Sequence, residues 1–249
     1  GSYAGNFSNS SSDTYGLILN TSSDQTLSGV LSGSGFYTVY DTDASGPVTL
    51  SGSNDFTSAL KFVGGKIIVG HADAFGSNSI LNLTTSNTKS IGIADGITMS
   101  GLELTGSETL TLTNNFRTGN LSSSSGAAID LQSFTLTVGS DNSSTSYNGV
   151  ISNSGGLTKS GSGTLTLSGT NTYTGATTIS AGTLKVTGTL AQTAVDVASG
   201  ATYDVDATDT VLSIEGAGTI DLTDAALTAG DTNPKTFSGV FNGANTFTK

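Results

Sequence analysis

The sequence predicts an all-β protein in which short strands stack into a single solenoid. Three observations lead to this fold class: short runs in which apolar residues alternate with threonine or serine, glycine or asparagine close to each run, and an internal repeat. Alternation is typical of strands that bury one face, because successive side chains of a strand point to opposite sides. Glycine and asparagine tolerate the backbone conformations that tight corners require.

The strands follow from this alternation in chain order. In each run, valine, isoleucine or leucine is expected to face the interior, while threonine, serine, lysine or aspartate faces solvent. Threonine suits the outward positions because its β-branched side chain favours a pleated strand. Turns of about 20 to 24 residues would give about 10 to 12 coils. The clearest runs occupy residues 109–113, 135–138, 164–168, 183–186 and 219–222.

The composition excludes several classes of protein. Glycine, serine and threonine together fill 113 of the 249 positions, which disfavours a helical protein because all three are weak helix formers. The absence of cysteine excludes disulfides and cysteine-ligated metals. A formal net charge of −11 with a single arginine, Arg117, argues against binding to nucleic acid.

An internal repeat favours a solenoid over a row of sandwich domains. Residues 47–69 align without gaps on residues 164–186, and nine of the 23 paired positions are identical. No recognisable domain linker separates the copies, so we expect one continuous β-helix over residues 1–249. The last copy stops inside the repeat, which indicates a fragment of a longer polypeptide. Including flanking elements, the copies lie near residues 29–69, 149–186 and 239–249.

Residues 157–186 closely resemble the autotransporter-associated β-strand repeat, also called the passenger-associated transport repeat. The pattern of this family is a Leu-Thr-Lys lead, then Gly-x-Leu-Thr-Leu-Ser-Gly, Asn-x-Tyr-x-Gly and Ile-x-x-Gly-x-Leu, and every element is present. In the copy at 47–69, Phe56 replaces the tyrosine and Ser58 replaces a glycine. The resemblance implies a right-handed parallel β-helix in the passenger of a type V secreted bacterial protein. It also implies an outer-membrane barrel in the same polypeptide, outside this chain, and a location at the cell surface or in the medium.

Few residues could support catalysis. His71 is the only histidine, so a Ser-His-Asp triad would have to use it, and we expect it to be a turn or surface residue. Some β-helical enzymes that cleave acidic polysaccharides have paired aspartates, a Gly-His-Gly element and basic residues, which only Gly70-His71-Ala72 approaches here. We therefore expect no enzyme and no catalytic or cofactor-binding residue, with glycan cleavage as a remote alternative.

Acidic residues gather between residues 196 and 224. Asp204 and Asp206 are two residues apart and would share one face of a strand, so with Asp209 they are weak candidates for Ca²⁺ ligands. Neither an EF-hand loop nor a calcium repeat is present. The favoured interpretation is a solvated acidic surface that keeps an extended rod soluble, with no cofactor.

Three functions remain open for such a rod. The first is a surface-displayed stalk whose coils stack outside the membrane and so favour net export, in partnership with the barrel. The second is adhesion to a glycan or protein on a host or neighbouring cell. The third is assembly into a fibre or aggregating adhesin, because the edge strands at the ends of a solenoid can pair with other chains.

Overall fold

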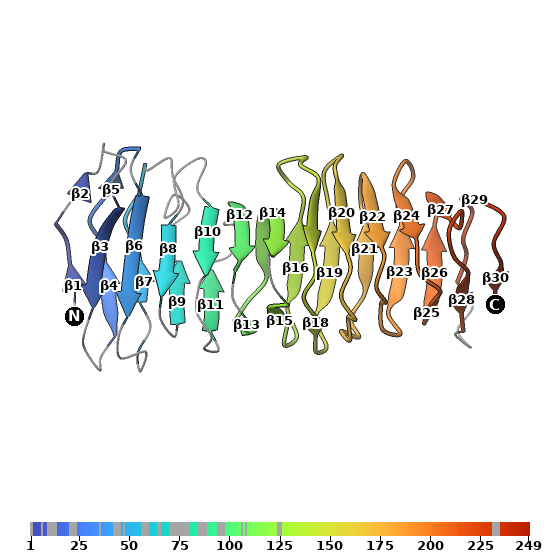
Figure 1. Cartoon of the computed structure of the whole chain (residues 1–249), viewed down its shortest axis with the longest axis horizontal. Coiled ribbons are helices and arrows are strands. Elements are labelled where there is room, and N and C mark those ends of the chain that lie inside the picture. Colours follow the sequence, from blue (N-terminus) through green and yellow to red (C-terminus); the bar gives the residue numbers. More distant parts are fainter. Residues whose placement is uncertain are drawn as a thin grey trace.

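The chain forms a rod with its termini at opposite ends, and its strands lie across the rod axis (Figure 1). All regular structure described is β-strand, as predicted. Of the residues described, none builds a helix with the length and apolarity that crossing a bilayer requires. The computed structural model describes residues 2–5, 7–8, 14–19, 24–34, 36–41, 46, 48–55, 60–63, 66–69, 80–83, 89–93, 98–105, 107, 109–123, 126–230 and 235–249.

One sheet runs along most of the rod, and we call it the long sheet. It has eleven strands, and neighbouring strands in the sheet come from successive turns of the chain. Its members are β3 (Thr14–Leu19), β6 (Phe36–Asp41), β8 (Leu60–Val63), β10 (Ile80–Leu83), β12 (Thr98–Leu104), β14 (Phe116–Ser123), β16 (Thr135–Val138), β19 (Gly156–Lys159), β21 (Thr177–Ile179), β23 (Ala194–Val197) and β26 (Ser213–Gly216).

Four further sheets complete the turns. The N-terminal sheet contains β1 (Ser2–Tyr3), β4 (Gln25–Leu27), β7 (Val48–Leu50), β9 (Lys66–Val69), β11 (Lys89–Ile93), β13 (Thr109–Leu112), β15 (Ala128–Asp130) and β18 (Ile151–Ser152). The C-terminal sheet contains β17 (Thr145–Tyr147), β20 (Thr164–Leu167), β22 (Thr183–Val186), β24 (Thr202–Val205), β27 (Thr219–Asp221) and β29 (Val240–Asn242). Two small sheets contain β2 (Phe7–Ser8) with β5 (Leu31–Ser32), and β25 (Asp209–Val211), β28 (Leu227–Ala229) and β30 (Phe247–Thr248).

The pairing register shows that these sheets belong to a solenoid. Every strand pair among the described residues is parallel, and paired residues are 17 to 24 positions apart. Tyr203 pairs with Ile220 at the shortest turn, whereas Ile67 pairs with Ile91 at one of the longest. The predicted all-β solenoid is confirmed. Some of its turns are shorter than the 20 to 24 residues expected, because their corners contain fewer residues.

Alternation along each strand produces the core. In β20, Leu165 and Leu167 are buried, while Thr164 and Thr166 are partly exposed. The register repeats this arrangement in β22 and β24, so that inward side chains of these strands lie over inward side chains of the previous turn. The core is therefore a set of apolar columns parallel to the rod axis, and removing these columns from water is the main favourable contribution to folding. One column contains Leu165, Leu184, Tyr203 and Ile220.

Glycines at one corner allow successive turns to approach closely. A Cβ on Gly169, which follows β20, would lie 2.0 Å from the carbonyl oxygen of Gly149 in the preceding turn. A Cβ on Gly188 would lie 2.2 Å from the carbonyl oxygen of Gly169 in the same way. Gly52 makes the equivalent approach in the first repeat copy. These positions require glycine because no side chain fits between the two backbones.

The two long repeat copies give the same order of strands, although the copies do not place all of these strands in the same sheets. In the long copies, β7, β8 and β9 correspond to β20, β21 and β22. Strands β8 and β21 both belong to the long sheet, whereas β7 and β9 lie in the N-terminal sheet and β20 and β22 in the C-terminal sheet. Phe237, which aligns with Tyr147, forms a bridge with Gly216 at the end of the long sheet. Tyr147 itself lies in the C-terminal sheet. The last turn is therefore shifted by one sheet position relative to its repeat alignment.

Candidate functional site

Residues 157–186 contain a complete contact between two turns. They include most of β19 and all of β20, β21 and β22, and the register pairs β19 with β21 and β20 with β22. The segment therefore supplies two adjacent strands to the long sheet and two to the C-terminal sheet. It is long enough to show how one turn is attached to the next.

Lys159 points into the rod although it carries a charge. It occupies an interior column of the long sheet between Val138 and Ile179, and only 1 % of its surface is exposed. Burial lowers the pKa of its amine, and the nearby carboxylate of Asp141 partly opposes this effect. Its Nζ donates hydrogen bonds to three carbonyl oxygens at two successive corners, those of Ser160 (2.6 Å), Gly161 (2.8 Å) and Ala181 (3.2 Å). The lysine thus satisfies buried backbone acceptors and links two turns.

A side-chain amide has a similar role at another corner. Oδ1 of Asn171 accepts a hydrogen bond from the N–H of Ile151, one turn earlier, at 3.1 Å. Its Nδ2 donates to the carbonyl oxygens of Gly169, in its own turn, and Thr189, one turn later. Asn171 therefore connects three successive turns. In the first repeat copy, Oδ1 of Asn54 accepts a hydrogen bond from the N–H of Leu31 at 2.7 Å, which is the same contact.

A buried chain of hydroxyl groups follows this corner. The hydroxyl of Tyr173 lies 2.7 Å from Oγ1 of Thr177, which lies 3.1 Å from Oγ1 of Thr193 in the next turn. Thr193 donates to the carbonyl oxygen of Gly175. Burial raises the pKa of Tyr173, so its phenol stays protonated and can serve as a donor. Each member of the chain has a partner, as buried polar groups require.

The elements of the repeat motif therefore act between turns. Gly182 has a φ of +65°, a left-handed conformation that favours glycine. A Cβ on Gly175 would lie 2.4 Å from the carbonyl oxygen of Gly155, one turn earlier. The apolar residues of the motif, Leu157, Leu165, Leu167, Ile179 and Leu184, are all buried in the core. These residues form the contact surface between neighbouring turns, together with Lys159, Gly169, Asn171 and Tyr173.

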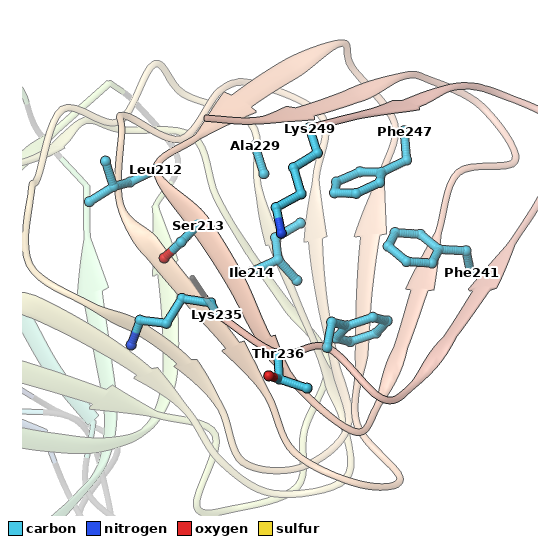
Figure 2. A pocket seen from close by; sticks show the side chains of 10 residues that line it. Leu212, Ser213, Ile214, Ala229, Lys235, Thr236, Phe241, Phe247 and Lys249 are labelled. Carbon is cyan, nitrogen blue, oxygen red and sulfur yellow. The ribbon is translucent and has the colours of Figure 1, made fainter. Parts of the chain in front are cut away.

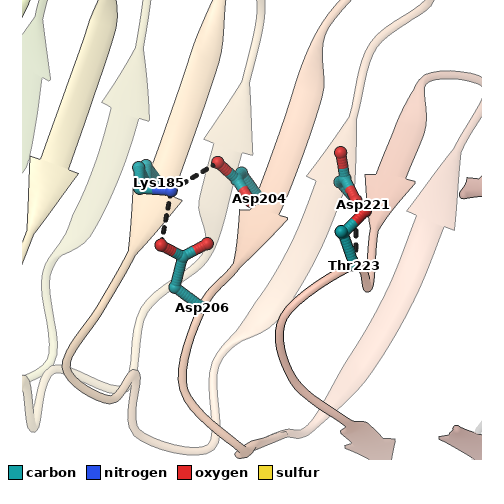
Figure 3. A network of polar contacts seen from close by, with 5 residues as sticks. All are labelled: Lys185, Asp204, Asp206, Asp221 and Thr223. Carbon is teal, nitrogen blue, oxygen red and sulfur yellow. Dashed lines mark hydrogen bonds and ion pairs between the residues drawn. The ribbon is translucent and has the colours of Figure 1, made fainter. Parts of the chain in front are cut away.

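Asp204 and Asp206 share one cationic partner. Asp204 lies in β24 and Asp206 follows it, and both contact the ammonium of Lys185 in β22, at 3.0 Å and 2.5 Å (Figure 3). The hydrogen bond with Asp206 raises the pKa of Lys185, and the same contact lowers the pKa of Asp206. Burial raises the pKa of Asp204. These ion pairs join adjacent turns on the outer surface.

Asp209 is separate from this pair and points into the rod, with 4 % of its surface exposed. Its Oδ2 accepts hydrogen bonds from the N–H of Leu190 at 2.9 Å and from the hydroxyl of Tyr203 at 3.3 Å. Its Oδ1 accepts from the N–H of Thr210. Asp209 therefore accepts a hydrogen bond from a backbone N–H of the preceding turn. Asn171, which lies two turns earlier, makes the equivalent contact with Ile151. Burial raises the pKa of this carboxyl group, since the charged form is poorly solvated there.

The three aspartates considered for calcium do not come together in one cluster. Two of them bind Lys185 and the third lies in the core. Within the part of the chain that the structure describes, no group of three or more histidine, cysteine, aspartate or glutamate side chains is placed to hold a metal ion. His71 lies outside the described residues. The corner role of Asp209 was missed from the sequence, although its position 38 residues after Asn171 corresponds to two turns.

Replacing Lys159 with methionine should lower the free energy of unfolding by about 2–4 kcal/mol, because three carbonyl oxygens lose a buried donor. Lys185→Met is the matched control, since it removes a lysine that forms only partly exposed ion pairs. Its expected cost is below about 1 kcal/mol. Urea denaturation followed by circular dichroism measures both. Equal losses for the two variants would contradict the role assigned to Lys159.

Asp209 should make stability depend on pH. Its folded-state pKa is raised, so the stability it contributes is fully present below the unfolded pKa of 3.8 and is lost as pH rises through the folded pKa. Asp209→Asn should therefore gain stability relative to the parent chain as pH rises from about 4 to 7. Asp206→Asn should differ from the parent chain with the opposite sign and at lower pH. Lys185 lowers the pKa of Asp206, so the stability that Asp206 contributes is present above its unfolded pKa of 3.8 and is lost as pH falls through the lower folded pKa. Urea midpoints from about pH 2 to 7 test both signs, and a difference between Asp209→Asn and the parent chain that does not change with pH would be evidence against the assignment.

Comparison with known proteins agrees with this geometry. Residues 157–186 match the family model of the passenger-associated transport repeat. No curated protein and no solved structure matches the chain. Such a repeat suggests the β-helix of an autotransporter passenger, which is secreted or held at the cell surface and is typically non-catalytic. The chain therefore contains a passenger-associated transport repeat, built into a parallel β-solenoid that is consistent with an autotransporter passenger.

Proposed function

We propose that this chain is a non-enzymatic stalk of an autotransporter passenger and that its turns support export by stacking on one another. The main support for the proposal is that residues of the repeat motif contact the neighbouring turn. Lys159, Gly169 and Asn171 each attach one turn to the next, through hydrogen bonds or close backbone approach. A motif built in this way serves the assembly of turns rather than the binding of a small molecule.

Stacking can bias export because each new turn is stabilised by the turn already folded. Fully burying a leucine or isoleucine contributes about 1.5–3 kcal/mol, and each turn of the repeat buries several. A folded turn is also much wider than an extended chain, so it cannot slip back through a narrow pore. The C-terminal barrel of the same polypeptide is the partner that supplies this pore. The lack of cysteine suits such a route, since no disulfide can fold the chain before it crosses.

Export is tested in the full-length polypeptide that includes the barrel. Gly169→Ala places a Cβ 2.0 Å from a backbone oxygen and should reduce surface display several-fold, whereas a Cβ on Gly126 meets no atom within 4 Å. Gly126→Ala is therefore the matched control and should leave display unchanged. Surface labelling normalised to total protein is the measurement. Normal display of a passenger with residues 157–186 scrambled would overturn the proposal.

An outward column of threonines supports an additional adhesive role. Thr164, Thr183, Thr202 and Thr219 lie in register on four successive strands of the C-terminal sheet. Their hydroxyl groups recur at the strand spacing of about 4.8 Å and can both donate and accept hydrogen bonds. The proposed partner is a glycan or protein on a host or neighbouring cell.

Replacing all four threonines with valine keeps the shape of the column and removes its hydroxyl groups. Beads coated with the parent chain should bind cells, and beads coated with the valine variant should bind several-fold fewer. Thermal unfolding of both proteins serves as the control for folding. Equal binding by the two proteins would show that this column of threonines does not contribute to adhesion.

A further inference from the structure

One corner of the rod lacks the backbone hydrogen bonds that are present at the corner before it. At the corner after β22, the N–H of Thr189 donates to the carbonyl oxygen of Gly169, one turn earlier, and the carbonyl oxygen of Thr189 accepts from the N–H of Asn171. At the corner after β24, residues 207–211 lie one turn beyond residues 188–192. No backbone hydrogen bond joins these two segments, in which the structure describes every residue. The corner after β24 is therefore attached in another way.

Alanine stands at the position of this corner where the preceding corners have glycine. The register that pairs Val186 with Val205 brings Ala207 to Gly188. A Cβ on Gly188 would lie 2.2 Å from the carbonyl oxygen of Gly169, so the close approach at that corner depends on the missing side chain. Ala207 carries a Cβ and excludes the same approach. This difference explains why the two backbones do not bond to each other after β24.

The side chain of Asp209 spans this gap. Its Oδ2 accepts a hydrogen bond from the N–H of Leu190 at 2.9 Å, and its Oδ1 accepts from the N–H of Thr210. The backbone N–H of Asp209 donates to the carbonyl oxygen of Ala226, in the following turn. The carboxyl group thus connects two corners that the backbone leaves unconnected.

The segment that follows Asp209 has few other contacts that hold it to the preceding turn. β25 pairs only with β28, in the next turn, and the first backbone hydrogen bond to the preceding turn joins Leu212 to Thr193. Leu212 and Ser213 line a cavity of about 320 Å³ (Figure 2), and the buried hydroxyl of Ser213 has no hydrogen-bond partner among the described residues. Atoms beside a cavity lose packing contacts on that side. Local opening occurs in segments of this kind, where few contacts resist it.

No cation balances the carboxyl group, since Asp209 forms no ion pair with any residue that the structure describes. The titratable groups that face it are the phenols of Tyr203, which donates to Oδ2, and Tyr173, two turns earlier. Burial raises the pKa of both phenols and the charge of Asp209 adds to this effect, so both stay neutral. The N–H groups that bond to the carboxyl belong to a leucine and a threonine, which carry no charge. An ionised carboxyl group is therefore better solvated when the corner is open.

We propose that Asp209 is a pH-sensitive latch between two turns, which keeps this corner closed while its carboxyl group is protonated and lets the corner open locally once the group is ionised. The protonated group still offers an acceptor oxygen to Leu190 and needs little solvation. Ionisation shifts the equilibrium toward the open corner, because the carboxylate is hydrated there. β22, β24 and β27 stay paired beside the corner, so opening does not unfold the rod. This inference concerns the folded rod and does not rest on the proposed role in export.

Hydrogen exchange resolved to single amides tests the latch in the parent chain. The N–H of Leu190 bonds to Asp209, and the N–H of Ile151 bonds in the same way to the side-chain amide of Asn171, which does not titrate. Between about pH 4 and 7, the protection factor of Leu190 should fall at least about threefold relative to that of Ile151. Equal changes at the two amides would show that only global unfolding responds to pH, and would overturn the proposal.

Two variants separate the latch from general effects of charge. Asp209→Asn keeps an acceptor oxygen and removes the titration, so the protection of Leu190 relative to Ile151 should no longer change with pH. Asp206→Asn is the matched control, because it removes a nearby carboxylate that binds Lys185 on the outer surface, and it should keep the pH response of Leu190. A response that survives in Asp209→Asn, or that disappears in Asp206→Asn, would refute the latch.

Discussion

Backbone hydrogen bonds between parallel strands one turn apart set the register on which the other contacts of this rod depend. The register places leucine over leucine and glycine over glycine, and it brings the side chain of Asn171 to the N–H of Ile151 in the previous turn. Close approach of the turns leaves no space for side chains at some corners and leaves backbone groups there without water. Glycine meets the first condition, and side chains that donate or accept hydrogen bonds meet the second.

Polar residues at the corners consequently act as part of the core. Lys159 and Asp209 carry ionisable groups, yet both are buried and bonded to the backbone of neighbouring turns. Asp209 occupies the corner position that Asn171 occupies two turns earlier, and it differs from asparagine in carrying a titratable group. A single corner position can thus be filled by residues of different charge if the oxygen acceptor is kept.

The strands could be predicted from the sequence because the alternation of Leu165 and Leu167 with threonine reports directly on which side chains face inward. Gap-free alignment of the two long copies likewise predicted equivalent strands. The burial of Asp209 could not be read in this way, because its neighbours suggested a solvated acidic surface and only the register reveals its relation to Asn171. The sheet that the last copy joins could not be predicted from the sequence either. The alignment of Phe237 with Tyr147 does not determine which sheet Phe237 joins.

The spread of turn lengths between 17 and 24 residues has a broader consequence. Core columns tolerate no slippage, so the differences in length are absorbed at the corners between strands. Insertions and deletions at those corners can change the outline of the rod while its internal stacking stays the same. A scaffold of this kind can diversify the surface it shows to its surroundings without having to evolve a new core.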